Sequence, residues 1–392
     1  MLRTLILGGG IGGLSLAREL GRRGLPATVL ERAPKLTPVG AGIIMNPNAM
    51  AVLDANGLAT CVRAESAPYL GRDTHDHHGR LLAARDYRPL YASGRLAPGA
   101  LVHRAHLHEC LADGVSPDLV HLDVRVRTLH ADADGVRVET EPGEVFSGDV
   151  LVGADGIASM VRARFFGATE PVYLGYRSHR FVVENRDGLV HFSEFLGRGQ
   201  SIGLVPISGG QLYVWTTFDS PRDSRAWALE DASAFRACFA QFTDARVRGA
   251  FAQLRSTDGV ICTDLEEIHH APWVRDRVVL LGDAAHAISP GMGQGAGMAM
   301  EDAAVLAEEL VDASAGRTAL AEALGSYERR RRGRVERIGR LSRAVIERGQ
   351  LTNPVACWLR NRRIRREGRA VDQMHATLAH LLGWPRPADE RG

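Results

Sequence analysis

The 392-residue chain lacks most of the features that mark special classes of protein. It contains a single lysine, Lys35, and its formal net charge at pH 7 is only +2. Aromatic residues make up 6%, and no apolar run is long enough to span a bilayer. Nothing in this balance favours binding to nucleic acid or a membrane span. With 45% hydrophobic and 24% charged residues, the composition is that of a globular protein.

Cysteine is also scarce. The five cysteines are odd in number and form no CxxC pair, so neither a disulfide framework nor a zinc site fits them. We expect reduced thiols and no metal site. The chain opens on MLRTLILGGG, without a basic stretch followed by a longer apolar run, which predicts no signal peptide and a cytoplasmic location. The cysteines are Cys61, Cys110, Cys238, Cys262 and Cys357.

The spacing of apolar residues predicts an α/β fold. A strand over 2–7, a helix and a strand over 27–30 form a βαβ unit, and apolar strands at 150–152 and 277–281 precede similar loops. Between residues 171 and 218, apolar and polar residues instead alternate, as in an antiparallel sheet. We therefore expect a Rossmann-like domain that is interrupted by an α+β domain and followed by C-terminal helices.

These patterns also suggest domain boundaries. A helical stretch is expected over 222–254, inside the inserted domain. The arginine-rich segment YERRRRGRVERIGRLSR is expected to be a solvated helix face, with phosphate binding as the alternative. We assign 1–72, 100–170 and 271–330 to the first domain, 73–99 and 171–270 to the inserted domain, and 331–392 to a C-terminal helical segment.

A glycine-rich motif follows the first strand. Gly8, Gly10 and Gly13 form G-x-G-x-x-G at the start of a helix, where free N–H groups and a partial positive charge suit a pyrophosphate. Glu31 ends the second strand, where a carboxylate accepts hydrogen bonds from a ribose diol, and its charge argues against a 2′-phosphate. The motif predicts a dinucleotide site; the alternative is a tight turn with an incidental glutamate.

Two further motifs follow later strands. DVLVGADGIASMVR places Asp155 and Gly156 in a corner, with Arg162 placed either to pair with Asp155 or to reach a phosphate. GDAAHAISPGMGQG carries Asp283 at a strand end, then Pro290 and glycines where a helix begins. A carboxylate there suits polyol hydroxyls, and bare N–H groups at a helix start stabilise an anion. Two such features on one sheet, about 270 residues apart in the chain, therefore predict one long ligand that is contacted at both of its ends.

The three motifs together resemble the single-component (group A) FAD-dependent monooxygenases, the para-hydroxybenzoate hydroxylase-like family. They occur in the family's order over residues 1 to about 330. The resemblance implies FAD as cofactor, NADPH or NADH as transient co-substrate, and O2. It implies insertion of one oxygen atom into an aromatic or polycyclic small molecule through a flavin C4a-hydroperoxide, in a monomer or homodimer. Hydroxylation is expected; epoxidation, Baeyer–Villiger oxygenation or flavin oxidoreduction without oxygen insertion are alternatives.

The resemblance also implies site residues. Catalytic and substrate contacts are expected from Tyr213, Arg180 and Pro290, with plain sheet packing as the alternative for the first two. His286 is expected to be structural, and Gly291, where some purine-hydroxylating relatives carry an acidic residue, gives no support to a urate-type reaction. The cofactor-binding residues are Gly8, Gly10, Gly13, Glu31, Arg32, Gly42, Ile43, Arg104, Asp155, Gly156, Asp283, Gly293, Gln294 and Gly295.

Overall fold

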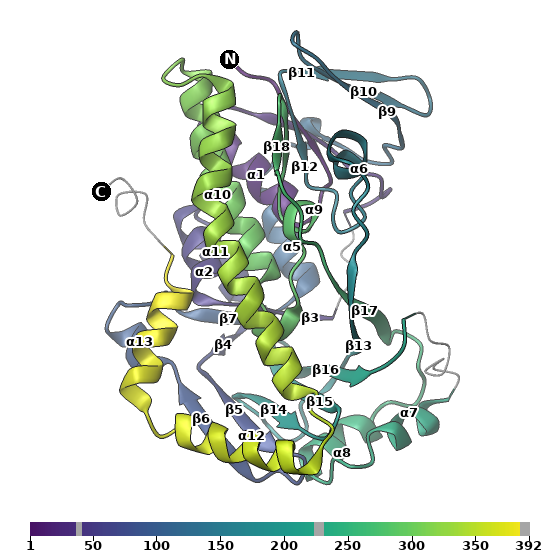
Figure 1. Ribbon diagram of the computed structural model, residues 1–392, viewed down its shortest axis with the longest axis vertical. Helices are drawn as coiled ribbons and strands as arrows, with labels where there is room; N and C mark the ends of the chain where they lie inside the picture. The colour runs from purple at the N-terminus through teal and green to yellow at the C-terminus, as the bar shows by residue number, and fades with distance from the viewer. Residues whose placement is uncertain (37–40, 223–230, 385–392) are drawn as a thin grey trace.

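A parallel sheet forms the upper half of the molecule in Figure 1, a computed structural model that describes residues 1–36, 41–222 and 231–384. Its central strands are buried apolar runs, as expected where helices and loops cover both faces, and one edge strand runs antiparallel to the others. Helix α1 (Ile11–Arg22) packs beside α10 (Gly295–Ser314), and both helices share one hydrophobic core with the strands of this sheet. The strand order is β18 (Val274–Arg275), β19 (Val278–Leu280), β12 (Val150–Gly153), β1 (Thr4–Leu7), β2 (Ala27–Leu30) and β8 (Val120–His121).

A mostly antiparallel sheet, in which one pair of neighbouring strands runs parallel, forms the lower half. Helices α7 (Ala232–Cys238) and α8 (Ala245–Ala252) cover one of its faces through a cluster of phenylalanines. The helix expected over 222–254 is therefore wrong as one element: 239–244 separates two helices, and 223–230 lies outside the described residues. The strand order is β17 (Ile261–Glu267), β13 (Val172–Glu184), β16 (Gln211–Asp219), β15 (Gln200–Ile207), β14 (Phe192–Leu196), β5 (Gly71–Asp76) and β6 (Leu81–Asp86).

Two smaller sheets and several short helices complete the architecture, and together these elements confirm the predicted α/β fold. The sheet β3 (Gly42–Met45), β7 (Gly99–His103) and β4 (Ser66–Tyr69) contacts β15 and so joins the two large sheets. The sheet β11 (Val145–Gly148), β10 (Val136–Thr140) and β9 (Val126–Ala131) lies at the top in Figure 1. The remaining elements in the first 170 residues are α2 (Pro47–Ala55), α3 (Ala59–Ala64), α4 (Arg88–Ala92), α5 (Arg104–Asp113), η1 (Pro117–Leu119) and α6 (Met160–Phe166).

Two cysteines form a disulfide, which corrects the expectation of reduced thiols. Cys61 of α3 and Cys110 of α5 are bonded with their Cα atoms 6.0 Å apart. The two positions are 49 residues apart in the chain, and only the packing of α3 against α5 brings them together. His106 lies beside them, with its Nε2 3.5 Å from the Cys110 sulfur.

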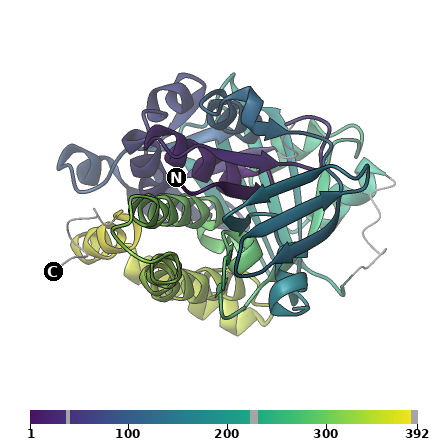
Figure 2. The same ribbon diagram turned by 90° about the horizontal axis from the view of Figure 1, so that it is seen from above.

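The C-terminal helices wrap around one side and the base of the molecule. Helix α11 (Leu320–Gly349) runs along much of the long axis and lies beside α10, as Figure 2 shows from above. The domain boundary expected after residue 330 falls inside α11. Helices α12 (Pro354–Glu367) and α13 (Val371–Leu382) follow, with α12 packed on β6. Among the described residues, no helix is long and apolar enough to cross a membrane.

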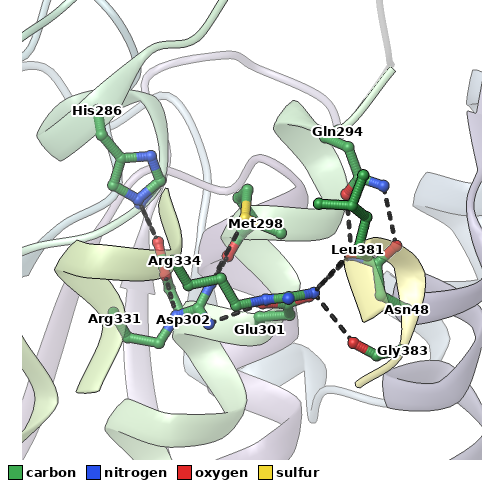
Figure 3. A network of polar contacts seen from close by, with 11 residues as sticks. Asn48, His286, Gln294, Met298, Glu301, Asp302, Arg331, Arg334, Leu381 and Gly383 are labelled. Atoms are coloured by element: carbon green, nitrogen blue, oxygen red, sulfur yellow. Dashed lines mark hydrogen bonds and ion pairs between the residues drawn. The ribbon is translucent and has the colours of Figure 1, made fainter. Parts of the chain in front are cut away.

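A buried ion cluster joins α11 to α10. The Arg331 guanidinium lies 2.7 Å from both the Glu301 and the Asp302 carboxylates, and the three side chains are at most 2% exposed (Figure 3). Arg334 also pairs with Glu301 at 2.7 Å. The expected solvated face is therefore wrong for these arginines, because their partners come from a different helix that local sequence does not reveal. Burial would raise the pKa of Asp302, but His286 and Arg331 hold it below its ordinary value.

Removing the cation at the centre of this cluster should destabilise the fold strongly. Arg331→Met leaves the Asp302 carboxylate buried without its guanidinium, and breaking a buried ion pair from one side costs about 3–5 kcal/mol. Arg317→Ala removes an ion pair to Asp312 in which the arginine is 57% exposed, and such pairs contribute below about 1 kcal/mol. Urea unfolding followed by circular dichroism measures both. Equal free energies of unfolding for the two variants would show that the buried cluster stabilises the fold no more than an exposed ion pair does.

Candidate active site

The three sequence motifs meet at the carboxyl edge of the parallel sheet. Strand β12 lies between β1 and β19, with Gly153 opposite both Leu7 and Leu280. The loops that leave these three strands are therefore neighbours, although their sequences are up to about 270 residues apart. This edge is where doubly wound sheets bind their ligands.

Each glycine of the first motif has a specific steric reason. A Cβ on Gly13 would lie 1.9 Å from the Gly8 carbonyl oxygen, so only glycine lets α1 pack this closely. Gly8 has a φ of +112°, and a Cβ there would lie 2.3 Å from the Ala154 oxygen. Gly10, the residue that caps α1, has no protein atom within 4 Å of its Cβ position. The helix start is thus left open on the side where a phosphate would approach.

Glu31 organises this loop from the end of β2. Its carboxylate oxygens accept hydrogen bonds from the Gly9 N–H at 2.6 Å and the Ala33 N–H at 2.8 Å. Arg32, in contrast, is exposed and does not line the cavity described below. The structure therefore places Glu31, but not Arg32, against the glycine loop.

The second motif shapes the neighbouring corner. Asp155 accepts hydrogen bonds from the Ser159 hydroxyl at 2.5 Å and the Met160 N–H at 2.7 Å, and so fixes the start of α6. Burial raises the pKa of Asp155, although the hydrogen bond from Ser159 opposes the shift. Arg162 fits neither predicted role, because its guanidinium donates to the main-chain oxygens of Ala284 and Ile157. Gly156 lines the cavity.

A cavity of about 370 Å³ extends from this edge to the face of the antiparallel sheet that α7 and α8 do not cover. Its volume lies within the range of small-molecule sites. It brings together residues that the sequence analysis proposed for the cofactor and for the substrate. The predicted residues that line it are Gly42, Ile43, Arg104, Gly156, Arg180, Tyr213, Asp283, Pro290, Gly293 and Gly295.

Two unpartnered charges face the cavity. Among the described residues, neither the Arg104 guanidinium nor the Asp283 carboxylate has a hydrogen-bond partner. Asp283 is open to the cavity yet lies deep in the fold, so burial raises its pKa while His286 and Arg104 oppose the shift. Burial lowers the pKa of Arg104, and Asp283 opposes this. Two opposite charges that face one cavity without polar partners in the described part of the chain fit a polar ligand that bonds to both.

The glycine-rich segment after Asp283 is fastened by α11. The Ser342 hydroxyl accepts from the Met292 N–H at 3.0 Å and donates to the Ser289 oxygen at 2.6 Å. A Cβ on Gly291 would lie 2.2 Å from the Ser342 main-chain oxygen, so a side chain at this position does not fit. Gly293 has a φ of +62° and turns the chain into α10.

Two side chains of this motif are turned away from the cavity. The prediction for Gln294 needs correction: it is fully buried, and its amide pairs with Asn48 at 2.9 and 3.1 Å, joining α2 to α10. His286 pairs through Nε2 with Asp302 at 2.5 Å and is not among the residues that line the cavity, as expected for a structural histidine.

Tyr213 stands where the two halves of the cavity meet. A Cβ on Gly42 would lie 2.5 Å from the Tyr213 ring, so β3 touches the antiparallel sheet at this point. Burial raises the pKa of Tyr213 to about 12, against the opposing effect of Arg180 and Arg104. The phenol therefore stays protonated at neutral pH. Arg180 donates to the Thr263 hydroxyl at 2.5 Å, and its Nε has no partner in the part of the chain that the structure describes.

Two functional residues could not be predicted from the sequence. Glu194 of β14 lines the far end of the cavity, and a single acidic residue in the apolar run FSEFL was the only local signal for it. Ser342 lies 50 residues after the loop that it fastens, and no pattern in its own helix points to that contact.

The described residues fit FAD. An open helix start, a carboxylate at the ribose position, an unpartnered carboxylate and guanidinium, and a glycine-rich turn lie along one path from Gly10 to Gly295. The path ends beside the face of the antiparallel sheet, where an aromatic ligand has room.

Comparisons with known proteins agree with this geometry. Residues 1–342 match the family described as FAD binding domain. The chain is 35% identical to the aurachin C monooxygenase/isomerase of Stigmatella aurantiaca over 374 residues, 93% of this chain and 94% of that protein. It is 32% identical to the 2-heptyl-3-hydroxy-4(1H)-quinolone synthase of Pseudomonas aeruginosa over 370 residues, again 93% and 94%. The structure of Klebsiella pneumoniae HpxO with FAD and uric acid matches with a TM-score of 0.86 at 27% identity, over 97% and 96% of the two chains.

The chain therefore belongs to the FAD binding domain family of class A flavin monooxygenases. It is an FAD-dependent monooxygenase, as the three motifs predicted.

The contact between Gly42 and Tyr213 gives a test of the cofactor side of the cavity. Gly42→Ala places a methyl group against the Tyr213 ring and should push β3 out of position, lowering FAD affinity about tenfold or more, as overpacking costs ~1–3 kcal/mol. Gly21→Ala on α1 is the control, because nothing lies within 4 Å of its Cβ position. Fluorescence titration of the apoprotein with FAD measures both. Unchanged FAD affinity in the Gly42 variant would contradict the proposed position of this strand.

Proposed function

We propose that the protein hydroxylates an aromatic heterocycle of the bicyclic quinolone type, consuming NADPH or NADH and O2. The observation that carries the proposal is the single cavity that joins the FAD-binding edge of one sheet to an aromatic, partly polar face of the other. The similarity to one relative, the 2-heptyl-3-hydroxy-4(1H)-quinolone synthase of Pseudomonas aeruginosa, supports the ring system.

The cofactor-side residues would hold FAD along the carboxyl edge. Asp283 is suited to accept hydrogen bonds from the ribityl hydroxyls, and Arg104 to donate to the cofactor from the start of α5. The Gly293–Gly295 turn presents the start of α10, whose N–H groups stabilise negative charge on the flavin's pyrimidine edge. When bound, reduced FAD supplies the activated oxygen; the chain supplies position, charge and exclusion of water.

The substrate-side residues would hold the ring. Tyr213, protonated through the neutral range, donates its phenolic hydrogen but does not act as a base. Arg180 offers further donors to an oxygen on the substrate. Apolar side chains line the cavity and would limit the access of water once the ligands are bound, which protects reactive oxygen species from unproductive decay. These are Ile43, Ile44, Leu265, Ile288 and Ile346.

Flavin reduction and oxygen labelling test the proposal together. FAD in the holoenzyme should bleach anaerobically with NADPH or NADH, and faster when 4(1H)-quinolone is present. In ¹⁸O2, mass spectrometry should find one labelled atom in the product per NAD(P)H consumed. Bleaching without a labelled product would instead support the alternative of flavin oxidoreduction without oxygen insertion.

Loss of the Tyr213 hydroxyl should slow turnover without changing its pH dependence. Because the raised pKa of about 12 keeps the phenol neutral below that pH, its charge does not change between pH 6 and 9. Tyr213→Phe removes a buried donor worth ~1–3 kcal/mol, so kcat/KM should fall about ten- to hundredfold with an unchanged pH profile. Tyr91→Phe, which removes a hydroxyl bonded to the Tyr69 oxygen outside the cavity, is the control. A titration between pH 6 and 9 that disappears in the Tyr213 variant would contradict this role.

A further inference from the structure

One row of residues crosses the cavity wall from a cation to a carboxylate. In the antiparallel sheet Arg180 lies opposite Trp215, Trp215 opposite Gly203, and Gly203 opposite Glu194. Directly opposite residues point to the same face of a sheet, and Arg180, Trp215 and Glu194 all line the cavity. With strands about 4.8 Å apart, the backbones of Arg180 and Glu194 lie about 14 Å from one another on this wall.

The glycine in the row gives the tryptophan its position. A Cβ on Gly203 would lie 2.1 Å from the Trp215 indole, so the ring lies across the neighbouring strand, toward the side of Glu194. Any larger residue at 203 would displace it. The middle of the wall is therefore a flat aromatic surface, on which a planar ring can stack.

Glu194 is an ionised acceptor at the far end of this surface. Burial would raise its pKa, but the ion pair with Arg72, assisted by Arg85 and Arg348, holds the pKa below its ordinary value. Arg72 contacts Oε1; among the described residues, no partner contacts Oε2. A carboxylate held in this way accepts hydrogen bonds but is a poor base.

The nearest hydroxyl groups on β15 and β16 already have partners. In the adjacent row, the Ser201 and Thr217 hydroxyls lie 2.5 Å apart, and the amide nitrogen of Gln350 donates to both. Glu194 is consequently the strongest acceptor that this end of the cavity offers to a ligand.

We infer that Glu194 determines substrate specificity by accepting a hydrogen bond from a ring N–H or O–H at the end of the substrate remote from Arg180. The substrate is a neutral, planar heteroaromatic compound with an acceptor oxygen toward Arg180 and Tyr213 and a donor toward Glu194. A 4(1H)-quinolone has this arrangement, because its carbonyl and its N–H lie on opposite sides of one ring. A ligand with a carboxylate at the Glu194 end is rejected by like charge. The inference deepens the proposed function and rests on it for the place of the substrate.

Two ligands and three proteins test this assignment. The ligands are 4(1H)-quinolone and 1-methyl-4-quinolone, which differ in the N–H alone. The proteins are the wild-type holoenzyme, the double variant Arg72→Met/Glu194→Leu, and the single variant Arg72→Met. The double variant removes the acceptor and its ion partner together, a replacement that buried pairs commonly tolerate. The single variant keeps the acceptor, and FAD content with near-ultraviolet circular dichroism confirms folding.

The readout is the dissociation constant from perturbation of the flavin spectrum. Wild type and Arg72→Met should bind the N–H ligand about tenfold or more tighter than the N-methyl ligand, and the double variant should bind both within about twofold. Since the added methyl group is the same in all three proteins, a purely steric preference would survive in the double variant. Such survival, or equal or absent binding of both ligands by wild type, would overturn the inference. Lack of oxygenated product with this preference intact would instead count against the proposed function alone.

Discussion

The buried Arg331 guanidinium is the contact on which the geometry of the cofactor edge depends. It neutralises Glu301 and Asp302 on adjacent positions of α10. Asp302 in turn accepts from His286 and from the Gly282 N–H, which fixes the turn that presents Asp283. Glu301 accepts from Asn48 at 2.8 Å, and Asn48 pairs with Gln294 (Figure 3).

One arginine on α11 thus sets the position of both ends of the segment that faces the cofactor. Two carboxylates buried side by side would repel one another and lose their hydration. The cation offsets the repulsion and part of the lost hydration. Ser342, three turns further along α11, holds the middle of the segment. Helix α11 therefore fixes the position of the active-site segment, although it contributes few atoms to the cavity wall.

The cavity itself results from a second constraint, the close approach of β3 to the antiparallel sheet. Gly42 touches Tyr213, so the cofactor edge and the substrate face meet without a gap. On the far side, a tryptophan lies over Gly203 between Arg180 and Glu194. Charge of opposite sign at the two ends of a flat aromatic surface orients a ligand, whereas the aromatic surface by itself would only retain it.

Much of the cofactor site was predictable, because its signals are local. The G-x-G-x-x-G spacing of Gly8, Gly10 and Gly13 is visible in six consecutive residues, and the clash that excludes a side chain at Gly13 is with Gly8 itself. Asp283 lies three residues after the last residue of its strand. Alternation in β16 likewise predicted the shared face of Tyr213 and Trp215.

Most of the errors concern partners that are distant in sequence. The arginines of α11 were expected to be solvated because their partners Glu301 and Asp302 lie about 30 residues away in the chain. Cys61 and Cys110 come together only because their helices pack against one another. Gln294 was assigned to the cofactor because it belongs to a motif that faces the cofactor. Its side-chain amide instead pairs with Asn48, which is 246 residues away in the chain. The position of Glu194 on the cavity wall follows only from the register of four strands, which the sequence does not reveal.

The most direct measurement is a crystal structure of the holoenzyme with 4(1H)-quinolone, grown without reductant. We expect the flavin ring between Gly42–Ile43 and the Pro290–Gly295 segment, and the quinolone along Trp215 in the same cavity. A flavin outside this cavity, or a quinolone bound away from the face of the antiparallel sheet, would contradict a shared site for cofactor and substrate.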